Sequence, residues 1–111
     1  MDDLEALQFL DDQYTVMLLV DLLRNPGLSI TELGNIRGKR ASPAKFNKLK
    51  TLISMGLMET RVEGHNKNRL YLSVEGQRMA LELEHIVKDL KHYSIGNDDS
   101  QRSSYLPMPS G

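Results

Sequence analysis

The segment from Ser42 to Gly56 constrains the fold of this chain more than any other, because both of its ends carry helix signals. Ser42 is a residue type that caps helices, and Pro43 suits the first helical position, where a backbone amide has no partner inside the helix. Gly56 favours a helix end, because glycine accepts the left-handed conformation that closes many helices. The sequence therefore predicts a helix from 43 to 55.

The apolar period changes directly after this helix. Residues 57–62 and 69–72 fit extended strands, and residues 63–68 between them are rich in Gly and Asn, which tolerate the positive φ angles of a hairpin tip. We therefore predict a β-hairpin. Ser73 is placed to cap a last helix, with Glu75 in its first turn, where a negative charge suits the helix dipole.

Two further helices are predicted before Ser42. The first runs from about 12 to 24, where apolar residues recur at helical spacing, and Asn25, Pro26 and Gly27 end it. The second is short. Ser29 and Glu32 have the spacing of a capping box, and Gly38 is a suitable C-terminal stop. The expected fold class is therefore mainly α with a small β-hairpin.

Composition limits the chemistry open to the chain. With 111 residues there is room for one domain, and the absence of cysteine excludes disulfides, thiolate catalysis and Cys-ligated zinc. The longest apolar run, from Val16 to Val20, is too short to span a membrane, and no signal peptide is recognisable. We expect a cytoplasmic protein that has no contact with a membrane.

Charge is distributed unevenly along the chain. Residues 24–78 hold eleven basic residues against four acidic ones, a net charge of +7, whereas residues 1–23 hold six acidic residues and no basic one. The net charge of the whole chain is only −1. A nearly neutral total therefore hides a basic middle, which is the distribution expected when one face of a protein meets a polyanion.

No motif in the sequence supports catalysis. Nucleophile elbow, phosphate loop and zinc-hydrolase patterns are all absent, so we expect no enzyme. His85, Asp89 and His92 share one helical face, but without cysteine a solvated face is the better interpretation than a metal site. Neither a metal nor another cofactor is predicted, and the sequence does not identify any small-molecule effector.

The order helix, short helix, turn, basic helix, hairpin, helix resembles the winged helix-turn-helix domain of the MarR, HxlR and PadR types of transcription regulator. The resemblance covers about residues 12–92. Its most specific elements are two spaced patterns, one before and one after the hairpin: Leu57, Glu59 and Arg61, then Tyr71, Ser73 and Gly76. The resemblance implies a winged helix-turn-helix domain with a C-terminal dimerisation helix, and a homodimer that places two recognition helices in successive major grooves of double-stranded DNA.

A helix has the diameter that the major groove admits, so the polar side of residues 43–55 is predicted to enter it. Asn47 is suited to read an adenine edge and Lys48 a guanine edge, while Ser42 and Thr51 fit base edges or phosphates. For a single lysine a solvated surface charge is an equally good interpretation, and the clustering of the set favours DNA. The predicted DNA-binding residues are Arg37, Lys39, Arg40, Ser42, Lys45, Asn47, Lys48, Thr51, Arg61, His65, Lys67 and Arg69.

The last helix carries an apolar seam of alternating spacing 4, 3, 4, 3, as in a short coiled coil. The seam has two interpretations, since it could pack on its own domain or pair with a second copy, and the resemblance favours the second copy. The N-terminal leucines are expected to join the interface, because the seam is too short to hold alone. The predicted dimerisation residues are Leu4, Leu7, Met79, Leu83, Ile86, Leu90 and Tyr93.

The expected organisation is an N-terminal helical extension over 1–11, the DNA-binding domain over 12–73, the dimerisation helix over 74–93 and a disordered tail over 94–111. The tail is expected to be a solvated terminus, although a short partner-binding peptide is an alternative for its last residues. The predicted function is sequence-specific binding of double-stranded DNA as a transcription regulator. The alternative is a winged helix that serves as a protein-interaction module in a larger assembly.

Overall fold

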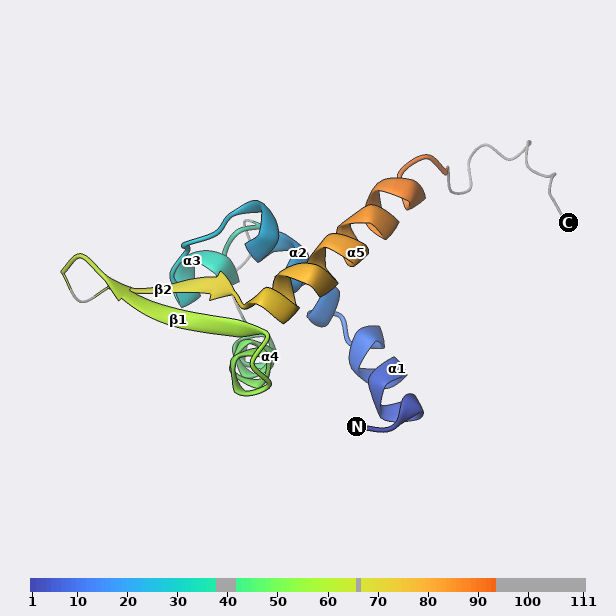
Figure 1. The fold of residues 1–111 in the computed structure, drawn as a ribbon, viewed down its shortest axis with the longest axis horizontal. Coiled ribbons are helices and arrows are strands. Elements are labelled where there is room, and N and C mark those ends of the chain that lie inside the picture. Colours follow the sequence, from blue (N-terminus) through green and yellow to red (C-terminus); the bar gives the residue numbers. More distant parts are fainter. Residues whose placement is uncertain (38–41, 66, 94–111) are drawn as a thin grey trace, which may run out of the picture.

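The computed structural model describes residues 1–37, 42–65 and 67–93 of the chain. Within these residues five helices and two strands follow one another, and Figure 1 shows the hairpin projecting from the helical part. The fold class predicted from the sequence, mainly α with one small antiparallel hairpin, is confirmed. The elements are α1 (Asp3–Asp11), α2 (Thr15–Arg24), α3 (Ile30–Gly34), α4 (Pro43–Ser54), β1 (Met58–Glu63), β2 (Lys67–Leu72) and α5 (Val74–Leu90).

The predicted starts of α3, α4 and α5 are confirmed by their hydrogen bonds. At α3 the Glu32 amide donates to Ser29 Oγ at 3.1 Å and the Ser29 amide donates to Glu32 Oε1 at 2.8 Å, which completes the capping box. Ser42 Oγ accepts the Lys45 amide at the start of α4, and Ser73 Oγ accepts an amide in the first turn of α5. Each hydroxyl thus satisfies an amide that has no partner within its helix.

Gly56 closes α4 as the sequence predicts. Its φ angle is +80°, and the Leu57 amide donates to the Leu52 carbonyl oxygen at 3.1 Å across the turn. This is the geometry in which a left-handed glycine turns the chain out of a helix. The chain passes from there directly into the hairpin.

Several boundaries differ from the predicted ones. The short helix α3, for which Gly38 is the expected stop, already ends at Gly34 with Asn35 as its C-cap. The helix expected from about 12 begins only at Thr15, because the Asp12 carboxylate accepts the Tyr14 amide at 2.9 Å and so holds the chain in a turn. The predicted hairpin tip of 63–68 is also shorter. Glu63 pairs with Lys67, so both belong to the ladder.

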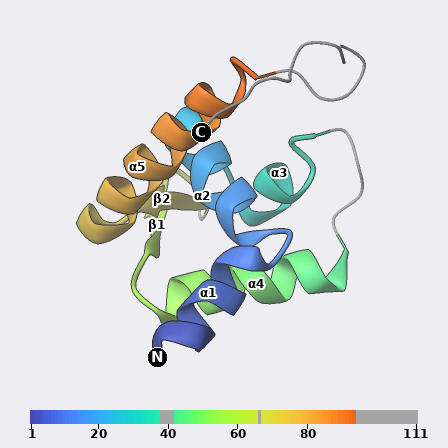
Figure 2. The same cartoon turned by 90° about the vertical axis from the view of Figure 1, so that its right-hand side faces the viewer.

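The core lies where α2, α3, α4, the base of the hairpin and the first half of α5 meet, and Figure 2 shows α2 in the middle of this arrangement. On α4 the fully buried stripe is Leu49 and Leu52. Phe46 and Ile53, which are also apolar, lie at its edge and are only partly buried. The buried side of α4 is therefore centred on Leu49 and Leu52, with Phe46 and Ile53 at its two edges.

Residues of the two spaced patterns lock α5 onto the start of the hairpin. Ser73 Oγ donates to the Gly56 carbonyl oxygen at 2.6 Å, and the Ser73 amide donates to the Leu57 carbonyl oxygen at 3.0 Å. At Gly76 a Cβ atom would lie 1.9 Å from that same carbonyl oxygen of Leu57, so the backbones of α5 and the hairpin approach too closely for any side chain. This contact sets the direction in which α5 leaves the sheet.

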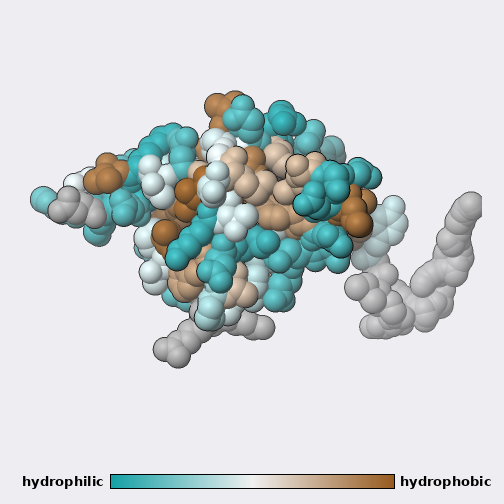
Figure 3. All heavy atoms as spheres, turned by 90° about the horizontal axis from the view of Figure 1, so that it is seen from below, coloured by the Kyte–Doolittle hydropathy of each residue, from teal (hydrophilic) through white to brown (hydrophobic). Residues whose placement is uncertain are grey.

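Figure 3 shows hydrophilic side chains along most of the hairpin, whereas apolar ones are exposed over the helical part of the molecule. In the described part of the chain, no helix has both the length and the apolar character needed to cross a membrane.

Candidate nucleic-acid interface

The outward side of α4 is small and polar. Ala44, Asn47, Thr51 and Ser54 are exposed, and they lie opposite the stripe that packs on the core. Thr51 Oγ1 donates to the Asn47 carbonyl oxygen at 3.0 Å, which uses its hydroxyl hydrogen within the helix. Among these four residues, the Asn47 amide is the group best suited to recognise a base edge.

Lys45 does not lie on an open flank of α4. Its residue is 6% exposed, and its Nζ atom donates to the Gly34 carbonyl oxygen at 2.9 Å. The reason is helical phase, since Lys45 shares the i, i+4, i+7 stripe with Leu49 and Leu52. Lys45 thus satisfies a carbonyl at the end of α3 and joins the two helices of the helix-turn-helix unit.

Lys50 is exposed and lies on α4, but it is absent from the predicted set of DNA-binding residues. The same helical phase that buries Lys45 places Lys50 on the side away from the core. A helical wheel centred on Leu49 and Leu52 places Lys45 on the buried side and Lys50 on the exposed side. Such a wheel would have put Lys50 in the predicted set in place of Lys45.

Lys48 lies on the other flank of α4, where it meets the segment before α2. Its Nζ atom is 4.5 Å from the centre of the Phe9 ring and 3.4 Å from Asp12 Oδ2. Its side chain is 18% exposed. The residue expected to read a guanine is therefore held by α1 and the turn that follows it.

Arg37, which precedes α4, also has a partner inside the molecule. Arg37 forms a two-pronged ion pair with the buried Asp21, with Nη2 at 2.7 Å from Oδ1 and Nε at 3.1 Å from Oδ2. A buried carboxylate needs such a partner, because burial without one is costly. Lys39 and Arg40 lie outside the described residues.

Arginines of the wing face acidic neighbours. Arg61 Nη2 is 2.7 Å from Glu59 Oε2, and its guanidinium lies over the Tyr71 ring at 4.5 Å. The hydrogen bond to Glu59 raises the pKa of Arg61, and the hydrogen bond that Tyr71 donates to Glu63 raises the pKa of Tyr71. The middle of the wing is thus a surface on which opposite charges balance.

Arg69 ties the wing to the body of the molecule. Its Nη1 atom donates to the Gly27 carbonyl oxygen at 2.7 Å, and its Nε atom is 3.8 Å from Glu63 Oε1. His65 and Lys67, by contrast, are exposed at the tip. The cationic character of the wing is therefore concentrated at its end.

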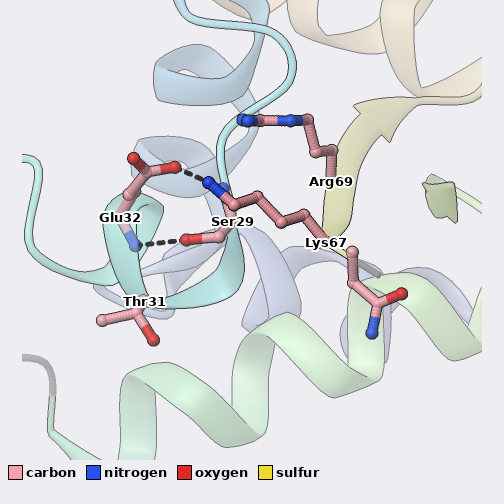
Figure 4. Close-up of a pocket in the computed structure, with 6 residues that line it drawn as sticks. Ser29, Thr31, Glu32, Lys67 and Arg69 are labelled. Carbon is pink, nitrogen blue, oxygen red and sulfur yellow. Dashed lines mark hydrogen bonds between the residues drawn. The ribbon is translucent and has the colours of Figure 1, made fainter. Parts of the chain in front are cut away.

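A hollow of about 350 Å³ separates the start of α3 from β2. Figure 4 shows Lys67 and Arg69 reaching it from the strand, while Ser29 and Glu32 form the capping box on its other side. The hydrogen bonds from Ser29 lower the pKa of Glu32, so its carboxylate stays charged beside the two cations. The hollow between the wing and the helix-turn-helix unit is therefore lined by both positive and negative side chains.

The predicted dimerisation residues fall into two groups. Met79 and Leu83, in the first half of α5, pack against the core of their own chain. The other five are exposed, with exposed fractions between 55% and 77%: Leu4 and Leu7 in α1, Ile86 and Leu90 in α5, and Tyr93 just after it. The first half of the seam thus packs on its own domain, whereas its second half is exposed and would be available to a second copy.

Two of the three histidines, His85 and His92, lie with Asp89 on α5 and the turn after it. Within residues 1–37, 42–65 and 67–93, no group of three or more His, Cys, Asp or Glu side chains is placed to hold a metal ion. The His85, Asp89 and His92 face is therefore an exposed polar side of α5 and the turn after it.

The sequence matches no known protein-family model and no curated protein. Solved structures do match. The crystal structure of SSV1 F-93 is 24% identical with a TM-score of 0.58, and the match covers 69% of this chain and 88% of that one. MepR, a transcription regulator of the Staphylococcus aureus multidrug efflux pump MepA, is 16% identical with a TM-score of 0.60, and the match covers 72% of this chain but only 60% of MepR.

A MarR family protein from Mycobacterium tuberculosis is 21% identical with a TM-score of 0.54, and the match covers 82% of this chain and 74% of that protein. At these identities the likeness concerns the fold. The chain has a winged helix-turn-helix fold, similar to that of MarR-family transcription regulators.

Proposed function

We propose that this protein is a transcription regulator that binds double-stranded DNA sequence-specifically as a homodimer. In this proposal α4 enters the major groove, and the wing, at about residues 63–68, contacts the phosphate backbone or the minor groove. No catalytic step forms part of the proposal. Proteins with the same fold include MepR, which regulates transcription.

The observation that carries the proposal is the open outer side of α4. A helix enters a major groove only if its outer side chains are short or able to bond base edges, and Ala44, Asn47, Thr51 and Ser54 meet this condition. The opposite side is locked to the body by Leu49, Leu52 and the Lys45 bond to Gly34. Such a helix is presented rigidly, as base reading requires.

The charge of the interface comes from fewer residues than the sequence suggests. Lys50 on α4 and Lys67 at the wing tip are exposed, and we assign the main phosphate contacts to them. Arg37, Lys45 and Arg69 instead bond to groups of their own chain. Asn47 remains the proposed base-reading residue, with Thr51 beside it.

A second copy of the chain would cover the exposed apolar residues. Ile86, Leu90 and Tyr93 extend past the core on the second half of α5, and Leu4 and Leu7 lie on the N-terminal helix. Large apolar side chains exposed in such number on a small protein mark an interaction site. Pairing through α5 would give the two-fold arrangement that presents two α4 helices to one duplex.

One observation favours the alternative of a protein-interaction module. Glu59 and Glu63 balance Arg61 and Arg69 on the wing, which leaves its middle close to neutral. A protein partner could bind such a surface, whereas a phosphate backbone gains little from it. The salt dependence of binding separates the two functions, because binding to DNA releases condensed counterions.

The test is fluorescence anisotropy of a labelled duplex titrated with the protein at several salt concentrations. We expect affinity to fall linearly on logarithmic axes as salt rises, and Lys50→Gln and Lys67→Gln each to reduce the slope by about 0.9. Lys91→Gln, an exposed lysine beyond the end of α5, is the matched control and should leave the slope unchanged. Absence of binding at low salt would favour the protein-interaction module.

Sequence specificity needs a second measurement. Fragments selected from genomic DNA by the protein should share a motif, and Asn47→Ala should reduce affinity for that motif more than for a random duplex. A loss of about 1–3 kcal/mol at one base position is expected for a bidentate contact to adenine. Equal losses on both duplexes would show that Asn47 does not read bases.

A further inference from the structure

The N-terminal helix α1 carries acidic residues at both of its ends and no basic residue. Asp2, Asp3, Glu5, Asp11 and Asp12 lie in it or directly beside it, and residues 1–23 contain no basic side chain. Such a helix repels a polyanion. Its position relative to α4 is therefore decisive for any protein that binds DNA through α4.

Residues 9–14 contact α4 at two points. Lys48, on one flank of α4, lies between the Phe9 ring at 4.5 Å and Asp12 Oδ2 at 3.4 Å. Ser42, which caps α4, shares a hydrogen bond of 3.1 Å with the Tyr14 hydroxyl. Both contacts are made by residues in α1 or just after it. Figure 2 shows α1 crossing in front of α4.

The attachment of α1 to the rest of the chain is weak. None of its residues is buried, and its leucines at 4 and 7 are exposed. An apolar hollow of about 120 Å³ also lies under it, lined by Phe9 and Leu10 together with residues of α2 and α5. A helix that leaves such space beneath it gains little packing energy and can be displaced at small cost.

We propose that α1 is an electrostatic brake on DNA binding, which holds Lys48 through Asp12 and Phe9 and so keeps this lysine from the phosphate backbone while α1 is docked. The proposal deepens the proposed function and rests on it. A lysine ammonium can neutralise the Asp12 carboxylate or a phosphate, but Lys48 cannot reach both while α1 stays docked. Docked α1 also keeps the Asp12 carboxylate beside α4, where it would repel a phosphate.

Two effects follow from this arrangement. While the Lys48–Asp12 pair holds, Lys48 makes no phosphate contact, and this lowers the affinity of the parent protein for DNA. Once the pair is lost, Lys48 becomes available for one additional phosphate contact, which steepens the dependence of affinity on salt by about 0.9. Anything that pulls α1 away from α4 would raise affinity in the same way.

The experiment compares two isosteric variants of the full chain, Asp12→Asn and Asp11→Asn. Both remove one negative charge from the same end of α1, but only Asp12 forms an ion pair with Lys48. Asparagine at position 12 keeps a side-chain oxygen for the Tyr14 amide, so the turn before α2 is retained. Anisotropy with one duplex at several salt concentrations measures affinity and slope, and circular dichroism checks the fold.

We expect Asp12→Asn to raise affinity roughly threefold to tenfold more than Asp11→Asn does, with a salt slope steeper by about 0.9. In a Lys48→Gln background the two asparagine variants should be equal, because there is no lysine to release. Equal gains in the parent background, or a difference that survives Lys48→Gln, would overturn the brake while leaving DNA binding intact. If no variant bound DNA at the lowest salt, both the brake and the proposed function would be wrong.

Discussion

The Nζ atom of Lys45 on α4 donates a hydrogen bond of 2.9 Å to the carbonyl oxygen of Gly34 at the end of α3. A cation and a helix-end carbonyl thus connect the two helices of the helix-turn-helix unit inside the protein. The hydrocarbon part of the lysine lies along the same stripe as Leu49 and Leu52. One of the basic residues in the middle of the sequence therefore stabilises the fold.

Lys45→Met should destabilise the protein by about 1–3 kcal/mol, because the Gly34 carbonyl would remain buried without its charged donor. Urea denaturation followed by circular dichroism measures the change. Lys50→Met, the matched control on the exposed side of α4, should shift stability by less than about 0.5 kcal/mol and lower DNA affinity instead. Equal stability of the two variants would contradict the role assigned to Lys45.

Gly76→Ala should destabilise the fold by about 1–3 kcal/mol or more, because the new Cβ would lie 1.9 Å from the Leu57 carbonyl oxygen and α5 would have to move. Thermal unfolding detects the loss. Gln77→Ala, at the next position of α5 and exposed, is the control, and it should have a melting temperature close to that of the parent. A stable Gly76→Ala variant would mean that α5 is not held this closely against the hairpin.

The ion pair between Arg24 and Glu84 links α2 to α5, with Nε 2.5 Å from Oε2, and should make stability depend on pH. The hydrogen bond from Arg24 lowers the pKa of Glu84 below its ordinary value of 4.5. A lowered folded-state pKa gives stabilisation that is complete above pH 4.5 and is lost as the pH falls through the lower folded value. The pair should therefore stabilise the protein at neutral pH and cease to do so in acid.

Melting temperatures of the parent and Glu84→Gln, measured from pH 7 down to pH 3, test this directly. The parent should melt higher at neutral pH, and the difference should shrink in acid as Glu84 becomes protonated. Glu82→Gln, on the exposed side of the same helix, should cause a smaller change at pH 7. A constant difference between the parent and Glu84→Gln at every pH would show that the carboxylate charge contributes nothing.

Ile86→Glu should convert the proposed dimer into a folded monomer, because Ile86 is 55% exposed and its replacement leaves the core intact. Leu83 is unsuitable for this test, since it packs against the core and its substitution would disturb the fold. Light scattering coupled to size-exclusion chromatography gives the mass of each species, and His85→Glu on the same helix is the control. A parent protein that is already monomeric would contradict the dimer.

Much of the secondary structure could be predicted because its signals are local. Ser29, Ser42 and Ser73 each accept an amide three residues ahead, so their spacing in the sequence is already the geometry of the cap. Gly56 ends α4 through its own backbone conformation. The break before α2 was missed, although the Asp12 side chain that causes it acts only two residues ahead. The strong apolar pattern that follows favours a helix from about residue 12, and it conceals the turn that the Asp12 side chain forms.

By itself, then, the sequence determined the order of the elements, the caps and the basic middle segment, because each depends on neighbours within a few residues. Only the tertiary structure decided where the cations are used. Lys45 meets Gly34, Arg37 meets Asp21, and Lys48 meets Asp12, all between elements that folding brings together. A charge count gives every lysine and arginine the same weight. Burial and distant partners assign some of them to the fold and leave others, such as Lys50 and Lys67, exposed for the proposed DNA interface.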